Sequence, residues 1–539
     1  MPLREECEFA QGRQARRKKK KRETKMTRIS RRGLLGTGAA AGVLAATGLP
    51  VRAQAKRGGR LRLGLAGANT SDSWDGRTHS DTFMIMMAYG CVFDCLTEIA
   101  ADGQLVGELA ESWEASPDAK TWTFNLRKGV TFHNGKPFGA DDVIASLNLH
   151  VADGAKSAAQ PIVSAIDEMK KLGEHQVQMV LKNGNADFPF LMADYHLLMY
   201  PAGQIEEAIS KGIGTGMYRV EAFDPGVRFV GKRVDSHYKD GRAGWFDEVE
   251  AIAINDQSAR MNALMTNQVD AVNRVDFKVE PLMRSNPQIE IFEVTGNQHF
   301  TFPMLTNVDP FTQLNVRKAL KHAVNRQELV DKILLGHGAV ANDHPIGPAN
   351  QYYAPDLPQN EYDPDKAAFY LKEAGMEGLQ VDLSAAEAAF PGAVDAAQLY
   401  QASAKNAGIT INVVQEPNDG YWSNVWIKKP WCASYWSGRP TEDWMFSSCY
   451  ETGVPWNDTK WENERFQSLL LDARVELDSA KRAEMYREMQ SLCSTDGGTV
   501  VPMYANYVDA ASKSLTNSGT IGNAWQMDNS RFIERWWFS

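Results

Sequence analysis

Aromatic side chains are concentrated in one stretch of the second half of the sequence. Seven of the 14 tryptophans fall within forty residues of one another. Tyr421 and Trp422 follow the turn-like segment 416–420, which contains Asp419, so we expect these aromatic side chains on a loop near a surface or a cleft. Aromatic walls with a few polar groups are typical of small-molecule sites. The seven residues are Trp422, Trp426, Trp431, Trp436, Trp444, Trp456 and Trp461.

A single arginine, Arg439, lies within this aromatic stretch and is the candidate for a charged anchor. A guanidinium group can hold a carboxylate through two parallel hydrogen bonds, each stronger than a neutral one. Arg439 could instead form a structural ion pair with Glu442 or Asp443. The residues alone leave both interpretations open.

Residues arranged for catalysis or for metal binding are not evident. The sequence contains no G-x-S-x-G, no H-E-x-x-H, no phosphate-binding loop and no dinucleotide fingerprint. The pair Asp141-Asp142 is a common feature in an acidic chain, and Cys91 and Cys95 have no matching Cys or His pair nearby. We therefore predict no catalytic residue, no metal site and no cofactor, and we favour a binding protein over an enzyme.

Six cysteines are present, of which Cys7 lies near the N-terminus. The remaining five cannot all pair with one another, so at least one free thiol is expected. Cys432 and Cys449 could form a disulfide in an oxidising compartment, but their spacing does not decide it.

The N-terminal 55 residues have the pattern of an export signal. The segment 30–35 contains the arginine pair Arg31-Arg32 and precedes a weakly apolar stretch, and Ala53-Gln54-Ala55 supplies a small-x-small cleavage pattern. We predict a twin-arginine signal peptide with an N-terminal extension over residues 1–55, and translation could start at Met1 or at Met26. No cysteine lies at the cleavage site, so we expect a periplasmic protein without a lipid anchor.

The charge of the chain is unevenly distributed. It has 58 basic and 67 acidic residues, of which 14 and 4 lie in residues 1–55, so the remainder carries a net charge of −19. An acidic surface repels phosphate backbones, and nucleic acid is not expected as a partner.

Strand and helix patterns alternate along the chain. Residues 121–126 alternate polar and apolar side chains, which predicts a half-buried strand. A helix is predicted from Ala140, with two carboxylates in its first turn, and others over 315–335 and over 363–374, the last after the N-cap and proline pair Asp363-Pro364. The pattern indicates a mixed α/β fold.

A long ordered set of motifs resembles the peptide/nickel-binding family of periplasmic solute-binding proteins that serve ABC importers. The resemblance covers essentially the whole mature chain. Its most specific block is Leu109–Trp113, Trp122–Pro137 and Ala140–Val143, followed by Gly214–Tyr218, Ala263–Asp270, Val316–Leu320 and Tyr362–Gly375.

The resemblance implies a two-lobed α/β binding protein with an inserted third subdomain and a hinge of two crossings. We expect lobe I to comprise residues 56–90, 205–300 and 506–539, the inserted subdomain residues 91–204, and lobe II residues 301–505. The crossings are expected near 300–307 and 502–506. Trp74 and Asp75 would face the cleft from lobe I.

The resemblance also bears on the ligand. Ser434 takes the position at which peptide-binding relatives carry an aspartate for the α-amino group of the ligand, and no arginine occurs in 384–400, where dipeptide binders have one. We expect a monomeric protein that binds a small peptide or a peptide-like, amino-acid-derived solute and delivers it to an ABC transporter permease. The same fold could instead carry a metal chelate, haem, an opine or a sugar, or act as a sensor, and a secreted enzyme is a further alternative. The expected ligand-binding residues are Arg439, Trp436, Ser434, Trp422, Tyr421, Asp419, Trp74 and Asp75.

Overall fold

A computed structural model describes residues 55–417 and 421–539, and Ala55–Ser539 form one compact unit. The arginine pair of the predicted export signal and Asp419 lie outside these described residues. Within the described ranges, no helix combines the length and the apolar character that a membrane crossing requires.

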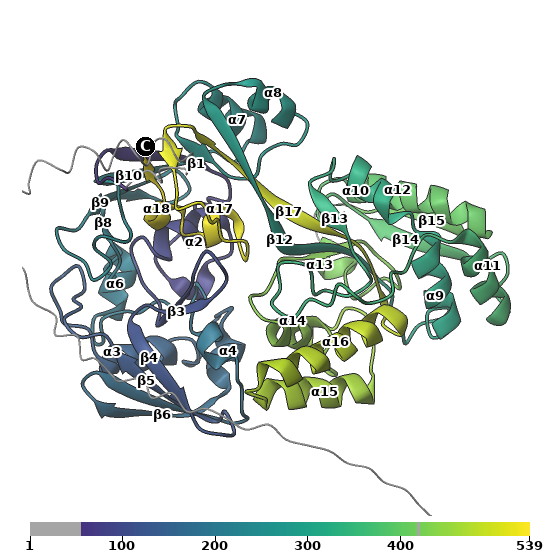
Figure 1. The fold of residues 1–539 in the computed structure, drawn as a ribbon, viewed down its shortest axis with the longest axis horizontal. Helices are drawn as coiled ribbons and strands as arrows, with labels where there is room; N and C mark the ends of the chain where they lie inside the picture. The colour runs from purple at the N-terminus through teal and green to yellow at the C-terminus, as the bar shows by residue number, and fades with distance from the viewer. Residues whose placement is uncertain (1–54, 418–420) are drawn as a thin grey trace, which may run out of the picture. The chain divides into compact units, whose positions relative to one another are not determined.

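A large mixed sheet runs through the molecule (Figure 1). Its strand order is β16-β12-β17-β11-β1-β10-β9-β8, and β13 also pairs with β17. Strand β1 runs parallel to β10 and β11, and β12 and β17 are antiparallel. The strands are β1 (Arg60–Leu65), β8 (Tyr218–Asp224), β9 (Arg228–Arg233), β10 (Glu248–Ala253), β11 (Ala271–Val272), β12 (Ile289–Pro303), β13 (Gly338–Val340), β16 (Ser434–Trp436) and β17 (Thr499–Ser512).

The two longest strands, β12 and β17, connect the two lobes (Figure 1). The C-terminal end of β17 pairs with β11 of lobe I, and the middle of β17 pairs with β13 of lobe II. The register of β12 against β17 breaks between Val294 and Gln298. A register break bends a strand pair locally, so this is where we expect the lobes to pivot. The lobe and subdomain boundaries given above stay a prediction.

Lobe I packs its helices and short strands around β1, β10 and β11. Its cores include Leu63 and Ala251 on one side and Val272 and Val508 on the other. The further elements are η2 (Gly76–Thr78), α2 (Thr82–Ala88), α6 (Ile205–Lys211), α7 (Gln257–Met265), α8 (Glu280–Ser285), β18 (Leu515–Thr516), α17 (Gln526–Asn529), α18 (Phe532–Arg535) and β19 (Trp537–Phe538).

The inserted subdomain has a sheet of its own, with the order β4-β5-β7-β6, and a separate core that includes Phe124 and Val177. A two-stranded sheet and three helices accompany it. The elements are β2 (Thr97–Ile99), β3 (Leu105–Gly107), β4 (Ala110–Ala115), β5 (Thr121–Leu126), α3 (Ala140–Asn148), α4 (Gln160–Ser164), β6 (Ile166–Gly173), β7 (Gln176–Leu181) and α5 (Phe188–Leu191).

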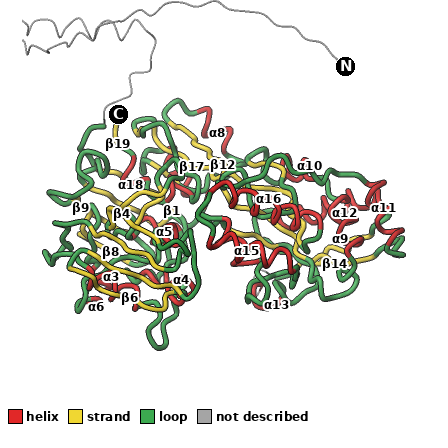
Figure 2. Tube along the Cα trace, turned by 60° about the horizontal axis from the view of Figure 1, so that its bottom comes forward, coloured by secondary structure: helices red, strands yellow, loops and turns green. Residues whose placement is uncertain are grey.

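Lobe II has two separate cores, one with Phe302 and Leu383 and one with Phe446 and Tyr486. The second core belongs to α14, α15 and α16, which we call the helix bundle. The elements are α9 (Leu314–Ala323), α10 (Arg326–Lys332), α11 (Pro364–Glu373), β14 (Gln380–Ala385), α12 (Ala393–Ala404), η3 (Lys405–Ala407), β15 (Thr410–Gln415), α13 (Tyr421–Asn424), α14 (Glu442–Cys449), α15 (Glu464–Val475) and α16 (Ser479–Thr495). Figure 2 shows these helices red and the strands yellow.

Most predicted elements are confirmed. Strand β5 alternates buried and half-buried residues, α3 begins at Ala140, and the carboxylate of Asp363 caps α11 by accepting from the N–H of Lys366. The helix predicted over 315–335 is instead two helices, α9 and α10. The break arises because the side chain of Asn325 caps α10 by accepting from the N–H of Glu328.

Candidate functional site

Arg439 lies in the loop between β16 and α14, and its guanidinium stays partly exposed. Of the nitrogens of this guanidinium, only Nη1 donates hydrogen bonds to described residues. It donates to the carbonyl oxygen of Ser437 at 3.0 Å, to the carbonyl oxygen of Gly438 at 3.3 Å and to the hydroxyl group of Ser437. The guanidinium carbon lies 5.7 Å from the centroid of the Trp444 ring. No carboxylate of the described chain forms an ion pair with Arg439.

The structural ion pair considered for Arg439 is therefore wrong. The carboxylate of Asp443 pairs with Arg474 at 2.9 Å, and Glu442 accepts from the N–H of Tyr352 at 2.7 Å. Both acids are buried within the helix bundle. Arg439 consequently keeps its capacity to bind an anion.

Side chains from the inserted subdomain and the hinge strands lie close to Arg439. Burial raises the pKa of Tyr195 and of Tyr507, while the positive charge of Arg439 acts on both in the opposite direction. The Tyr507 hydroxyl donates to Oδ1 of Asn297 at 3.2 Å, and Nδ2 of Asn297 donates to the Arg439 carbonyl at 3.1 Å. Tyr195 also packs edge to face on Trp525, with centroids 5.6 Å apart.

The close packing behind Arg439 explains a local sequence feature. A Cβ at Gly438 would lie 1.5 Å from Oδ1 of Asn297, so any larger residue there would displace the Asn297 side chain. The loop that carries Arg439 is thereby held against β12 through Asn297.

A cavity of about 450 Å³ lies in lobe I, a size typical of small-molecule sites. Its charged residues include Asp81 and Arg274, which form an ion pair, and Nε of Arg274 also donates to Gln526 at 3.2 Å. Gln526 directly follows Trp525, whose ring packs against Tyr195, so the cavity lies near the residues that surround Arg439. The lining residues are Ala66, Gly67, Ala68, Asn69, Ser71, Asp72, Ser73, Thr78, His79, Ser80, Asp81, Met84, Asn255 and Arg274.

The loop after β1 shapes this cavity. Oδ1 of Asn255 accepts from the N–H of Gly67 at 2.9 Å, and its Nδ2 donates to the carbonyl of Ala68 at 3.0 Å. Gly67 has a φ of +92°, and a Cβ there would lie 2.4 Å from the carboxyl carbon of Asp81. Glycine is required because the loop passes this close to Asp81.

Two of the predicted site residues lie on β16. Ser434 is fully buried, and its Oγ has no hydrogen-bond partner among the described residues. Trp436 is 6% exposed, and its Nε1 donates to Oδ2 of Asp458 at 3.2 Å. Trp436 therefore packs behind the Arg439 loop and presents little surface to a ligand.

The structure corrects two predictions about aromatic residues. Trp74, expected in the cleft, is 1% exposed and packs against Phe223 and Phe229, because apolar rings surround it on the inner side of its loop. Tyr421, expected on a loop near a surface or a cleft, is also 1% exposed, and its hydroxyl donates to the carbonyl of Ala433 at 2.8 Å.

Asp75 and Trp422 were also predicted to bind the ligand; the structure places Asp75 in an ion pair and Trp422 at the surface. The carboxylate of Asp75 pairs with Arg77 at 2.7 Å and caps η2, and Asp75 does not line the cavity. Trp422 is 41% exposed, as expected for a loop aromatic, and lies edge to face with Tyr435 at 5.7 Å between centroids.

The sequence reasoning missed Tyr195, Tyr507, Asn297, Asp81 and Arg274. Of these, Asp81 alone had a local signal, because it directly precedes α2 and caps it. The others come from segments far apart in the sequence, and only the fold brings them together.

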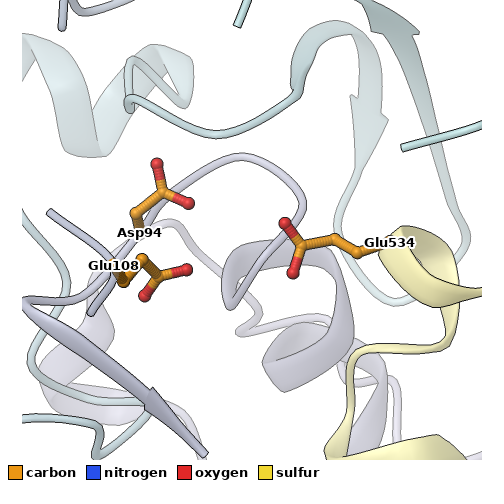
Figure 3. A group of neighbouring side chains, drawn as sticks. All are labelled: Asp94, Glu108 and Glu534. Atoms are coloured by element: carbon orange, nitrogen blue, oxygen red, sulfur yellow. The ribbon is translucent and has the colours of Figure 1, made fainter. Parts of the chain in front are cut away.

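Three buried carboxylates, Asp94, Glu108 and Glu534, face one another and have the spacing of metal ligands (Figure 3). The ammonium group of Lys239 already lies among them, 2.5 Å from Glu108, 2.8 Å from Glu534 and 3.3 Å from Asp94. Arg531 adds a second cation, 2.7 Å from both Glu108 and Glu534. The group is thus a charge-paired core cluster, in which Lys239 fills the place that a cation would take.

Cys432 and Cys449, which the spacing left open as a disulfide, are both free and buried. The thiols of Cys91, Cys95 and Cys493 are free and buried as well.

Comparison with known proteins shows to which family the sequence is similar. Residues 104–458 match the family described as bacterial extracellular solute-binding proteins, family 5. The dipeptide-binding protein of Escherichia coli (strain K12) is 27% identical over 459 residues, which cover 76% of this chain and 83% of that protein.

Solved structures share the fold. The periplasmic binding protein DppA from Helicobacter pylori, in complex with the peptide STSA, has a TM-score of 0.74 at 20% identity and covers 89% of this chain and 98% of its own. The protein AgaA from A. tumefaciens R10, in complex with agropinic acid, has a TM-score of 0.74 at 23% identity and covers 89% of this chain and 99% of its own.

Proposed function

The chain belongs to the family 5 bacterial extracellular solute-binding proteins, and from that premise we propose that it binds a small peptide or a peptide-like, amino-acid-derived solute for an ABC importer. In this proposal the solute binds between the lobes and is enclosed when they close. The closed, loaded protein then delivers it to the membrane permease of the importer.

The proposal rests mainly on one observation: the guanidinium group of Arg439 forms no ion pair within the described part of the chain. Its guanidinium is held over Trp444 and forms no ion pair with a carboxylate among the described residues, although Asp194 is near enough for the charge of Arg439 to help lower the pKa of that buried carboxyl. A ligand carboxylate could form the direct bidentate pair that Arg439 lacks. Peptides and amino-acid derivatives carry such a group.

The polar cavity of lobe I would receive the rest of the ligand. Asp81 and Arg274 offer one negative and one positive group there, and Asn69 and Ser73 add hydrogen-bonding groups. A zwitterionic solute with several amide groups suits such a lining. Because Arg439 belongs to lobe II and Asp81 to lobe I, a ligand that contacts both favours the closed form.

Other cargoes remain alternatives within the same fold: a metal chelate, haem, an opine or a sugar, with or without transport. A sensor role without transport or a secreted enzyme is a further alternative. The export signal, a periplasmic location without a lipid anchor and a monomeric state also belong to this proposal.

The test is to identify the solute that co-purifies with protein from its native host by native mass spectrometry. The same solute is then added to refolded, emptied protein while small-angle scattering and melting are measured. A peptide-like mass, a smaller radius of gyration and a higher melting temperature are expected. A sugar, a haem or a metal complex as the bound species, or scattering unchanged by it, would contradict the proposal.

A further inference from the structure

The inserted subdomain touches lobe II at a place away from the hinge strands. The N–H of Ala186 donates to the carbonyl of Arg474, at the end of α15, at 2.6 Å. Figures 1 and 2 both show the end of α15 beside the inserted subdomain. In Figure 1 α15 lies near the bottom of the view, below β12 and β17.

A buried ion pair accompanies this backbone contact. Nη2 of Arg482, on α16, lies 2.7 Å from Oδ2 of Asp187, and the two side chains are 9% and 5% exposed. Asp187 directly precedes α5 of the inserted subdomain. The pair therefore joins two parts of the chain that are almost 300 residues apart in sequence.

Arg482 is positioned from within the helix bundle. Its guanidinium carbon lies 5.4 Å from the ring centroids of both Tyr352 and Tyr486, and Nη2 also donates to the Tyr486 hydroxyl at 3.1 Å. Because two rings and a hydroxyl already orient it, Arg482 loses little freedom when it meets Asp187.

The backbone of the inserted subdomain is shaped to fit at this contact. A Cβ at Gly184 would lie 2.9 Å from Cγ1 of Val475 and 2.2 Å from the carbonyl oxygen of Asp118. Trp444, the residue on which Arg439 stacks, also packs against the core of the inserted subdomain. The contact between the inserted subdomain and lobe II therefore includes Trp444 of α14, the residue that orients Arg439.

We propose that Asp187 and Arg482 form a clasp by which the inserted subdomain holds the lobes closed. The clasp gives this subdomain a role that needs no contact with the solute. It rests on the proposed closure of the lobes around a ligand. Opening separates the two charges and returns both to water, so the pair contributes only to the closed state.

Removing one partner would leave a buried charge without its counter-ion and thus favour opening. The test variant is Asp187→Asn, which keeps the shape of the side chain. The matched control is Glu488→Gln, which lies on α16 as Arg482 does and removes an exposed ion pair with Arg465 of α15. Arg482→Lys serves as a second variant on the other side of the clasp.

The measurement is the distance between spin labels attached through non-natural amino acids at the exposed positions 172 and 369, in refolded, solute-free protein. Leu172 belongs to the inserted subdomain and Phe369 to lobe II, and both lie outside the contact. We expect Asp187→Asn to reduce the ratio of short to long distances by at least about tenfold and Glu488→Gln to leave it unchanged. Distance distributions of Asp187→Asn and Arg482→Lys that coincide with that of the wild type would overturn the clasp.

A second arm separates the clasp from the proposed function. A pool of di- and tripeptides from exhaustively digested casein is added to each protein. The pool should shorten the distance in the wild type, and at least about tenfold more of it should be needed for Asp187→Asn. If the pool has no effect on the wild type but the solute-free proteins differ, the clasp stands and the peptide proposal fails.

Discussion

The guanidinium carbon of Arg439 lies 5.7 Å from the centroid of the Trp444 ring, and the indole of Trp444 packs in turn against the core of the inserted subdomain. A cation held over an indole face is stabilised without losing its hydrogen-bonding edge. The arrangement therefore fixes the direction in which Arg439 can meet an anion.

The first prediction concerns the affinity of this site. Arg439→Ala should weaken binding of the co-purifying solute by at least about tenfold, because losing a charge-assisted contact costs roughly 1.5 to 3 kcal/mol. Arg439→Lys should recover part of this loss, since an ammonium group cannot reproduce the planar fork. Isothermal titration calorimetry provides the measurement.

Two controls keep this experiment interpretable. The melting temperature of the empty Arg439→Ala protein should stay near that of the wild type, because among the described residues the side chain donates hydrogen bonds only to its own loop and otherwise stacks only on the partly exposed ring of Trp444. Arg465→Ala removes an exposed arginine of lobe II and should not change affinity. Unchanged affinity in a folded Arg439→Ala protein would return Arg439 to a structural role.

The second prediction concerns pH. Burial raises the pKa of Asp458 to about 6, although the indole N–H groups of Trp426 and Trp436 favour its charged form. An unfolded aspartate has a pKa of about 3.9, so the folded state holds this proton more tightly. The stability that results is complete below about pH 4 and is lost as pH rises through about 6.

The Asp458→Asn variant has no carboxyl group at this position, so its stability lacks this pH-dependent contribution. Relative to that variant, the wild type should lose up to about 3 kcal/mol of stability between pH 4 and pH 7. Chemical denaturation at several pH values measures the difference. Asp356→Asn, which changes an exposed ion pair with Arg487, is the control and should run parallel to the wild type. A pH profile of Asp458→Asn that parallels the wild type would show that Asp458 ionises normally.

Local signals in the sequence predicted the parts of this fold that depend on neighbouring residues. The cap at Asp363 and the alternation along β5 each act within a few residues, and both were predicted correctly. The family motifs supplied the fold, and Arg439 was singled out as an anchor because it is an arginine among tryptophans.

Burial was harder to predict, because residue type does not tell which side of a loop faces the core. Trp74 and Tyr421 are aromatic residues next to turns, as Trp422 is, yet only Trp422 is well exposed. Tyr195 and Tyr507 reach the Arg439 loop from segments that lie hundreds of residues apart. Their meeting depends on the sheet order and the packing of the lobes, and no spacing in the sequence indicates it.

The third prediction concerns the core charge cluster. Lys239→Met should destabilise the protein by about 3 to 5 kcal/mol, because it removes the ammonium group beside Asp94 and one of the two cations that the buried carboxylates of Glu108 and Glu534 share. The exposed pair of Lys211 with Glu207 provides the control, and Lys211→Met should change stability by less than about 1 kcal/mol. Urea unfolding compares the two variants, and equal midpoints would show that Arg531 alone balances the cluster.

The last prediction concerns export and rests on the sequence, since Arg31 and Arg32 lie outside the described residues. Replacing both by lysine should keep the precursor in the cytoplasm, because a twin-arginine exporter recognises the arginine pair itself. Cell fractionation with an antibody against the mature chain measures the distribution, and N-terminal sequencing of the exported wild type should begin at Lys56. Arg16 and Arg17 form a second arginine pair in the N-terminal extension, so their double lysine variant is a matched control that should be exported normally. Normal export of the Arg31 and Arg32 double variant, or a mature N-terminus far from Lys56, would contradict the assignment of residues 1–55 as a twin-arginine signal.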